Sequence, residues 1–273
     1  MLRILSLGAG VQSTTLALMA AKGEIKPPDC AIFADTQSEP ELVMGHLWWL
    51  QAQLPYPVYI ATTGDLGEHA TTVRTSRKTG KRVVKSLIPA YILNPDGTRG
   101  IMGRKCTTDF KIMPIQRMTR QLLGLKQVRT KNILVEQWIG ISADEAHRMK
   151  PSRVPWIKHR WPLIDLRMTR SDCLKWMEAN RYPEPPRSAC YFCPFHGDAE
   201  WINLRDNQPR EFKKAIAFEE RLSAAYSEDS GFRGQGAFLH NSLVPIGEAV
   251  LGTVKDHAQL DLWGNECEGM CGV

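Results

Sequence analysis

Short apolar runs alternate with longer amphipathic stretches over the first half of the chain. The apolar runs have the length of buried strands and cover residues 2–7, 30–34, 58–61 and 133–141. Apolar positions at helical spacing lie between them, at residues 14–21 and 41–53. Because buried strands that alternate with helices form parallel sheets, this pattern predicts an α/β fold with a doubly wound, mostly parallel sheet.

The rest of the chain does not continue this alternation of strands and helices. Residues 74–105 contain Gly and Pro but little periodicity, so we expect an insertion or mobile loop there. Thr169 and Asp172 have the spacing of a capping box that starts a helix running to Asn180, and a second helix is expected over residues 209–225. We therefore divide the chain into an α/β domain, 1–182, with a basic insertion at about 69–108, and a Cys-containing helical region with a tail, 183–273.

Length and composition fit a cytoplasmic globular protein. The chain has 273 residues, of which 43% are hydrophobic, and no apolar run approaches the ~20 residues of a membrane helix. The N-terminal residues lack the pattern of a secretory signal. In the cytoplasm, the seven cysteines are expected to be ligands or reactive thiols rather than disulfides.

The positive charge is concentrated in two segments. Residues 69–108 contain nine Lys or Arg and one acid, and residues 146–160 contain five cations and no acid, whereas the whole chain has a net charge of +6. The remainder is thus net negative. A basic area on an otherwise acidic protein is typical of a polyanion partner, although charged runs often form only a solvated surface. The distribution favours a nucleic acid.

A glycine-containing segment joins the first predicted strand to the first predicted helix. Glycines allow backbone N–H groups to approach an anion, and a helix N-terminus favours negative charge. The segment lacks the Gly-Lys-Ser/Thr of a P-loop and the third glycine of a dinucleotide fingerprint. Its candidate nucleotide-binding residues are Ser6, Gly8, Ala9, Gly10, Gln12, Ser13 and Thr14.

The second strand ends in a carboxylate, Asp35, at the edge where open α/β sheets bind ligands. Together the two segments resemble the PP-loop ATP pyrophosphatase superfamily, in particular its phosphoadenylylsulfate-reductase-like branch. The resemblance implies ATP with Mg²⁺ and a fold like that of the adenine nucleotide alpha-hydrolases. The family loop reads Ser-Gly-Gly-x-Asp-Ser, whereas this chain has Gln12 in place of the aspartate, so Asp35 or Asp144 is the candidate to hold Mg²⁺ instead.

Three further segments extend the resemblance. Residues 104–114 are similar to an Arg-x-Cys-Thr-x-x-x-Lys-Ile-x-Pro motif, especially that of the PP-loop component of DNA phosphorothioation systems. Residues 138–148 are similar to a Gly-x-x-x-Asp-Glu-x-x-Arg motif, and residues 162–165 to a Pro-Leu/Ile segment that precedes a helix. The resemblance implies catalytic roles for Asp35, Lys111 and Arg148, with Arg148 on a phosphate.

Three cysteines are candidate metal ligands. Cys190 and Cys193 form a C-x-x-C, and Cys106 lies in its own motif. Three thiolates suit a [4Fe–4S] cluster in which one iron has no protein ligand, and the resemblance supports this. The alternative is structural Zn²⁺, which requires a fourth ligand that His196, Cys267 or Cys271 could supply. Cys30 and Cys173 are expected in the core.

These observations predict an ATP pyrophosphatase that adenylates a nucleic acid for sulfur insertion, as in DNA phosphorothioation or base thiolation. A sulfur donor such as a cysteine desulfurase is the expected partner, and a homodimer is allowed. The alternative is a reductase of phosphoadenylylsulfate or adenylylsulfate, to whose C-terminal tail Glu266-Cys267 is loosely similar. A nucleotide-binding regulator without catalysis is a third reading.

Overall fold

The computed structural model describes residues 1–127 and 129–252. Contacts divide this part of the chain into two compact units. Residues 1–63 and 107–189 form the first unit, and residues 64–106 and 190–252 belong to the second. The basic insertion therefore belongs to the same unit as the Cys-containing region, although about 80 residues separate them in sequence.

The first unit is built on a five-stranded parallel sheet in the order β3-β2-β1-β8-β9. Its strands are β1 (Leu2–Leu7), β2 (Cys30–Asp35), β3 (Val58–Thr62), β8 (Val135–Ile139) and β9 (Ile157–Arg160). The predicted α/β class with a parallel sheet is confirmed. The four predicted strands are all present, and the fifth, β9, was not predicted.

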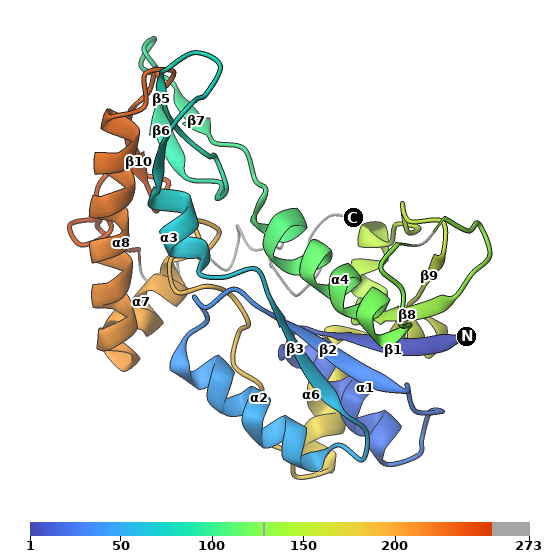
Figure 1. Cartoon of the computed structure of the whole chain (residues 1–273). Helices are drawn as coiled ribbons and strands as arrows, with labels where there is room; N and C mark the ends of the chain where they lie inside the picture. Colours follow the sequence, from blue (N-terminus) through green and yellow to red (C-terminus); the bar gives the residue numbers. More distant parts are fainter. Residues whose placement is uncertain (128, 253–273) are drawn as a thin grey trace. The chain divides into compact units, whose positions relative to one another are not determined.

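Helices cover both faces of this sheet (Figure 1). One face packs on α1 (Val11–Ala21), α2 (Glu41–Gln53) and α6 (Arg170–Ala179), through side chains that include Leu5 and Phe33. The other face packs on α4 (Met113–Leu122), through side chains that include Ile4 and Ile32. Successive residues of a strand point to opposite faces, so both faces of the central strands are apolar. The shorter elements of this unit are a π-helical turn η1 (Thr107–Ile112), a 3₁₀ turn η2 (Ala143–Arg148) and α5 (Pro162–Asp165).

The strand order reverses direction at β1. The chain moves from β1 to β2 and β3 on one side, and returns to place β8 and β9 on the other side. The loops that follow β1 and β8 therefore lie next to each other at the carboxyl edge of the sheet. In open α/β sheets such a switch point leaves a crevice in which ligands bind.

Helix α1 begins three residues earlier than the sequence predicted. Gly10, with extended backbone angles, is the N-cap, and Val11 is the first helical residue. The Ser13 hydroxyl, expected to cap the helix, lies inside the first turn, where it accepts from the N–H of Gly8 and donates to the carbonyl of Gly10. The capping box of α6 is confirmed, because the Thr169 hydroxyl accepts from the Asp172 N–H while the Asp172 carboxylate accepts from the Thr169 N–H.

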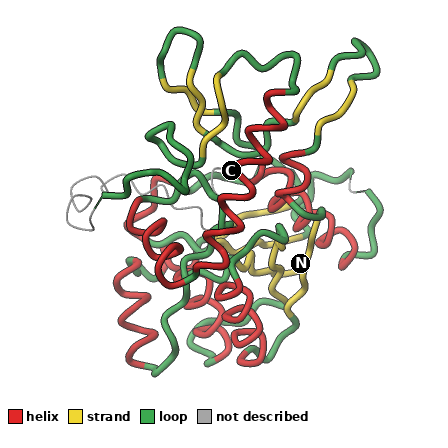
Figure 2. Tube along the Cα trace, turned by 90° about the vertical axis from the view of Figure 1, so that its left-hand side faces the viewer, coloured by secondary structure: helices red, strands yellow, loops and turns green. Residues whose placement is uncertain are grey.

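The second unit combines hairpins with helices. Its elements are α3 (Leu66–Thr71), β4 (Val73–Thr75), β5 (Arg82–Val84), β6 (Tyr91–Leu93), β7 (Arg99–Ile101), α7 (Asp198–Asn207), α8 (Pro209–Ser227) and β10 (Gln235–Phe238). The pair β4–β5 is separate from the antiparallel sheet β10-β6-β7 (Figure 2). Residues 74–105, expected to be an insertion or a mobile loop, contain two hairpins made of β4 with β5 and β6 with β7. Gly80 and Gly97, at φ 65° and 80°, allow the tight turns on which the two hairpins depend.

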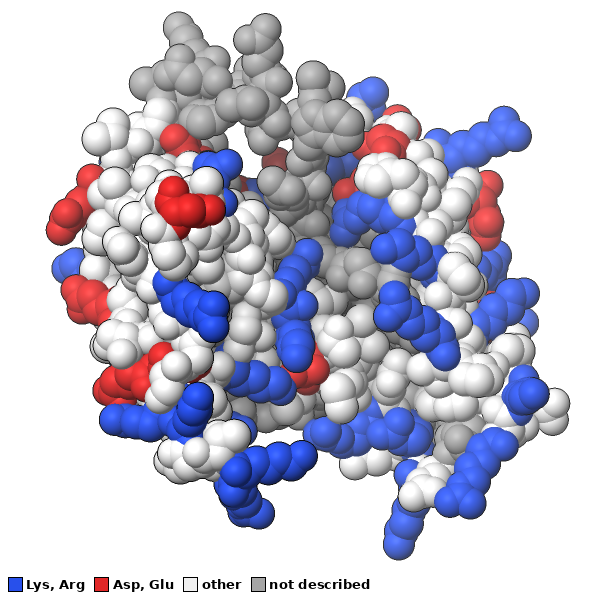
Figure 3. Space-filling view, turned by 90° about the horizontal axis from the view of Figure 1, so that it is seen from above, with Lys and Arg blue, Asp and Glu red and all other residues white. Residues whose placement is uncertain are grey.

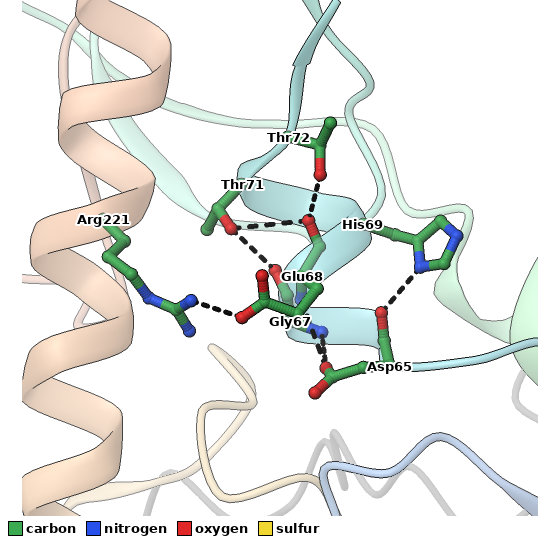
Figure 4. Close-up of polar contacts among 7 residues, drawn as sticks. All are labelled: Asp65, Gly67, Glu68, His69, Thr71, Thr72 and Arg221. Carbon is green, nitrogen blue, oxygen red and sulfur yellow. Dashed lines mark hydrogen bonds and ion pairs between the residues drawn. The ribbon is translucent and has the colours of Figure 1, made fainter.

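Helix α3 is held by a side-chain cap at its N-terminus and by an ion pair to α8 (Figure 4). The Asp65 carboxylate accepts from the N–H groups of Gly67 and Glu68, at 2.7 and 3.1 Å, and so caps the helix. Arg221 of α8 forms an ion pair with Glu68 at 2.5 Å. These contacts connect the segment before the basic hairpin to the longest helix of the same unit.

Within residues 1–127 and 129–252, no helix has both the length and the apolar character needed to cross a membrane.

Candidate functional site

The loop between β1 and α1 is held in a defined shape by short-range bonds. The Thr14 N–H donates to the Gly10 carbonyl at 3.0 Å, and Ala9 adopts a left-handed conformation at φ 57°. The Ser188 hydroxyl donates to the Gly8 carbonyl. The first turn of α1 contains no acidic residue. The loop thus has the two properties that an anion site requires, a helix N-terminus with unsatisfied amides and no opposing charge in that turn.

Gly140 brings the end of β8 into direct contact with this loop. A Cβ atom at this position would lie 2.9 Å from the backbone nitrogen of Ser13 and 3.2 Å from the carbonyl carbon of Gln12. Real Cβ atoms do not approach backbone atoms so closely, so the contact depends on glycine. The two sides of the switch point are therefore packed backbone against backbone.

Gln12 connects the loop to the segment after β8. Its side chain is fully buried, and its amide Nε2 donates to Glu145 at 3.2 Å and to the Ser142 hydroxyl at 3.4 Å. The other carboxylate oxygen of Glu145 accepts from Arg148 at 2.5 Å. The glutamine that replaces the family's aspartate is thus bonded to a carboxylate from another element.

The end of β2 contributes a second charged group. The Asp35 carboxylate accepts from the Gln37 N–H at 2.7 Å, and the Glu39 carboxylate accepts from the hydroxyl and N–H of Thr36 at 2.7 and 3.2 Å. Burial raises the pKa of Glu39 above its usual range, while the positive charge of Lys111 opposes that rise. This end of the strand is consequently a folded turn with its carboxylates fixed.

Lys111 lies beside both strand ends. Only 6% of this residue is exposed, although a lysine almost never remains buried without a charged partner. A small cavity at the carboxyl edge of the sheet is lined by Lys111 and Glu39, and also by Ser6, Leu7, Gly8, Phe33, Ala34, Ile115 and Ser188. Lys111 therefore lines the same cavity as Gly8 of the β1–α1 loop.

Three of the predicted nucleotide ligands also form hydrogen bonds with other elements of the unit. The Ser6 hydroxyl accepts from Gln137 at 2.9 Å, and the fully buried Thr14 hydroxyl bonds the Nε2 atom of His46 in α2 at 3.1 Å. The Asp144 carboxylate accepts from the N–H of Arg170 at the start of α6, at 3.1 Å. The groups bonded to the loop itself are instead Ser13, Ser188 and, through Gln12, Glu145.

The candidate metal ligands Cys106, Cys190 and Cys193 all belong to the second unit. Cys190 and Cys193 are joined by a turn in which the Cys193 N–H donates to the Cys190 carbonyl at 2.9 Å. Yet within the described part of the chain no three Cys, His, Asp or Glu side chains are arranged to hold a metal ion. The described residues therefore do not show the predicted cluster site, and Cys267 and Cys271 lie outside them.

The two cysteines expected in the core are there. Cys30 and Cys173 are buried, and burial raises the pKa of Cys30 to about 11. A thiol with such a pKa stays protonated near neutral pH, so it is a poor metal ligand or nucleophile.

The basic insertion presents its cations on the β4–β5 hairpin, whose residues 74, 77, 78, 81 and 82 are exposed cations. The turn of the hairpin is ordered by a bond from the Ser76 N–H to the Lys81 carbonyl at 2.8 Å. Arg82 forms an ion pair with Glu228. Many Lys and Arg side chains stand out from the protein surface (Figure 3). The hairpin therefore exposes five cations of the basic insertion.

Sequence reasoning did not find four groups of this site. Gly140, Glu145, Glu39 and Ser188 are separated from the loop by at least 25 residues, and they lie against it or its neighbouring strand ends only after folding. A signal existed for two of them, because Gly140 and Glu145 fall within the family-like segment 138–148.

Comparisons with known proteins give limited information. No family model matches the chain, and no curated protein matches it. Among solved structures, the chain is similar to a crystal structure of phosphoadenylyl-sulfate (PAPS) reductase from Candida auris in complex with phosphate. The TM-score is 0.41 at 16% identity, and the match covers 67% of this chain and 74% of that chain. A likeness of this degree says nothing about the reaction, so the function is inferred from the site itself.

Proposed function

We propose that this chain is a PP-loop ATP pyrophosphatase that adenylates a nucleic-acid substrate. The observation that carries the proposal is the β1–α1 loop, which ends at a helix N-terminus without acidic residues and shares a cavity with the buried Lys111. A fixed loop with free helix amides beside a buried cation suits a polyphosphate. Its position at the switch point of a parallel sheet is where mononucleotides bind in this class of fold.

The proposed reaction is an in-line displacement at the α-phosphorus of ATP. An oxygen of the substrate forms a bond to that phosphorus, the bond to the bridging oxygen of the β-phosphate breaks, and pyrophosphate leaves with the electron pair. Any proton on the attacking oxygen passes to water. Lys111 and Arg148 would neutralise charge that develops on the phosphates, which is the main contribution a protein makes to phosphoryl transfer.

Mg²⁺ would enter with the nucleotide. Asp35, half-buried at the end of β2, is the carboxylate that fits this role, since Mg²⁺ sites usually combine one or two carboxylates with substrate phosphates. Asp144 is the second candidate, and one of its oxygens accepts from the N–H of Arg170 at the start of α6.

The adenylated oxygen would then be displaced by a sulfur nucleophile. A bond to sulfur forms at the activated atom of the nucleic acid, and AMP leaves with the oxygen. The sulfur would be the outer sulfur of a persulfide on a partner such as a cysteine desulfurase. A second thiol would then break the S–S bond that joins donor and product, forming a disulfide and leaving the sulfur on the nucleic acid. The exposed cations of the β4–β5 hairpin support a nucleic acid as the acceptor, because a small sulfonucleotide needs fewer positive charges.

The products of ATP turnover test this proposal. With an oligonucleotide present, we expect ATP labelled at the α-phosphate to release pyrophosphate and to transfer the label to the oligonucleotide, and the label to leave as AMP when a sulfur donor is added. ADP with phosphate as products would refute the assignment. Turnover of a sulfonucleotide with thiol reductant, in a protein that leaves ATP intact, would favour the reductase.

Variants of the buried cation locate the activity. Lys111→Met should lower the rate of pyrophosphate release by about 10²-fold or more, the size of effect seen when a charge-stabilising group is removed. Lys111→Met removes the positive charge that Glu39 faces and so could also destabilise the fold. The double variant Lys111→Met with Glu39→Gln leaves no charge at either residue, so any loss of activity that remains in a folded protein reports on catalysis. Lys175→Ala, at an exposed lysine on α6, is the control and should retain full activity.

A further inference from the structure

One carboxylate joins the two sides of the switch point. Glu145 Oε2 accepts from the Gln12 amide at 3.2 Å, and Glu145 Oε1 accepts from the Arg148 guanidinium at 2.5 Å. Gln12 belongs to the first turn of α1, whereas Glu145 and Arg148 belong to η2, 133 residues away from Gln12 in sequence. A single side chain therefore connects the helix start to the cation that follows β8.

The orientation of Gln12 follows from this contact. The amide nitrogen must face Glu145, because the reverse orientation would place the amide oxygen against a carboxylate. The amide oxygen is then left buried, and it makes no hydrogen bond within the described part of the chain. A buried acceptor without a partner destabilises the folded protein. The protein tolerates this cost at a residue whose other end is bonded to Glu145.

The backbone at Glu145 is also unusual. Its angles, φ −106° and ψ 17°, interrupt the helical turn η2 at this residue. This conformation lies near the sparsely populated bridge region, in which many active-site residues are found. Both the Glu145 and Arg148 side chains are only 16% exposed, so the ion pair is shielded from solvent. A shielded, geometrically fixed pair restrains the guanidinium more than an exposed one does.

We propose that Glu145 is a positioning residue, which fixes the first turn of α1 through Gln12 and aims Arg148 at the phosphates held by the loop. The inference rests on the proposed function, since it assigns Arg148 to the phosphates of ATP. Glu145 itself has no attraction for the nucleotide, because its carboxylate is negative. Its effect is on geometry, and geometry affects the rate of reaction more than ground-state binding.

Separate measurement of binding and turnover tests this role. In Glu145→Ala, we expect kcat for total ATP turnover to fall by about 10- to 100-fold, as for a catalytic group misplaced by a fraction of an ångström to 1 Å. The Kd for ATP, measured by calorimetry, should change by less than about 3-fold, because the loss of restraint on Arg148 is offset by the loss of a negative charge. Arg148→Ala should instead weaken ATP binding as well as turnover.

A swap of the two side chains tests the contact itself. Gln12→Glu alone places two carboxylates against each other and should lower kcat strongly. Combined with Glu145→Gln, it restores a carboxylate–amide pair, and the double variant should recover at least about 10-fold in kcat over Gln12→Glu. Residues in direct contact show this kind of non-additivity, whereas independent sites do not. If Glu145→Ala fails to fold, Glu145→Gln, which keeps the shape of the side chain, is compared in its place.

Three results would overturn the inference. They are a kcat within about 2-fold of wild type in Glu145→Ala, a Kd that weakens as much as kcat falls, and a swap no more active than Gln12→Glu. The proposed function fails by a different result, the release of ADP and phosphate by the wild-type protein. Because kcat is measured as total ATP turnover, the role of Glu145 can be judged whichever phosphate bond is broken.

Discussion

The contact between Gly140 and the β1–α1 loop makes a sharp prediction, because one methyl group is enough to test it. In Gly140→Ala, the new Cβ would lie 2.9 Å from Ser13 N and 3.1 Å from Ser13 Cα. These are backbone atoms, so no side chain can rotate away. Ordinary contact begins at 3.4 Å, so the loop must retreat by about 0.5 Å, the difference between 3.4 and 2.9 Å.

The magnitude follows from two opposing effects. Forcing a methyl group into a packed contact costs about 1–3 kcal/mol, and three backbone atoms within 3.2 Å place Gly140 at the upper end of that range. Replacing glycine also restricts the unfolded chain, which returns about 0.4–1 kcal/mol. We therefore expect a net loss of about 2 kcal/mol in the free energy of unfolding, together with a fall of roughly 10-fold in ATP turnover, since a displacement of 1 Å can cost ~10²-fold.

Urea denaturation and a pyrophosphate-release assay measure the two effects. Gly45→Ala is the matched control: Gly45 lies within α2 of the same unit, and no atom of the described residues lies within 4 Å of the position that its Cβ would take. That control should leave turnover unchanged and stabilise the protein by about 0.5–1 kcal/mol. If Gly140→Ala is as stable and as active as wild type, the two sides of the switch point are not packed as the structure indicates.

Two further predictions concern protons and salt. Burial lowers the pKa of His46 to about 4 from an ordinary 6.5, so between these values the unfolded chain binds a proton that the folded protein does not. The stability that depends on neutral His46 is complete above pH ~6.5 and is lost as the pH falls toward 4, by on the order of 2–3 kcal/mol. His46→Gln should therefore reduce the difference in thermal stability between pH 7.5 and pH 5. An unchanged difference would contradict this assignment. Replacing four hairpin cations by Glu should weaken binding to an oligonucleotide. It should also reduce the slope of log K against log salt concentration by ~0.9 per lost phosphate contact on duplex DNA. If the same number of substitutions elsewhere had the same effect, the effect would be due to net charge and not to the hairpin. The hairpin set is Arg77, Lys78, Lys81 and Arg82, and the control set is Lys26, Lys175, Arg181 and Lys213.

Local patterns in the sequence were sufficient for most of the α/β unit. The helix over 41–53 was predicted with its observed bounds, and β1 likewise, because both are specified by apolar periodicity over neighbouring residues. The start of α1 was misplaced by three residues, since Ser13 has the preference of a cap whereas Gly10 takes that position. The loop, Asp35 and Lys111 could be identified as a candidate site because each lies at the end of a predicted strand or within a recognisable motif.

Only the tertiary structure decided which distant residues meet. The sequence contains no local signal that residues 64–106 fold with residues 190–252, because that pairing depends on contacts far apart along the chain. The same holds for Glu145, which meets Gln12 only because β1 and β8 are neighbours in the sheet. Hydrophobic periodicity and capping preferences act over a few residues and therefore determine elements. The bonding of a buried amide to a carboxylate 133 residues away is determined by strand order and by the absence of a Cβ at Gly140.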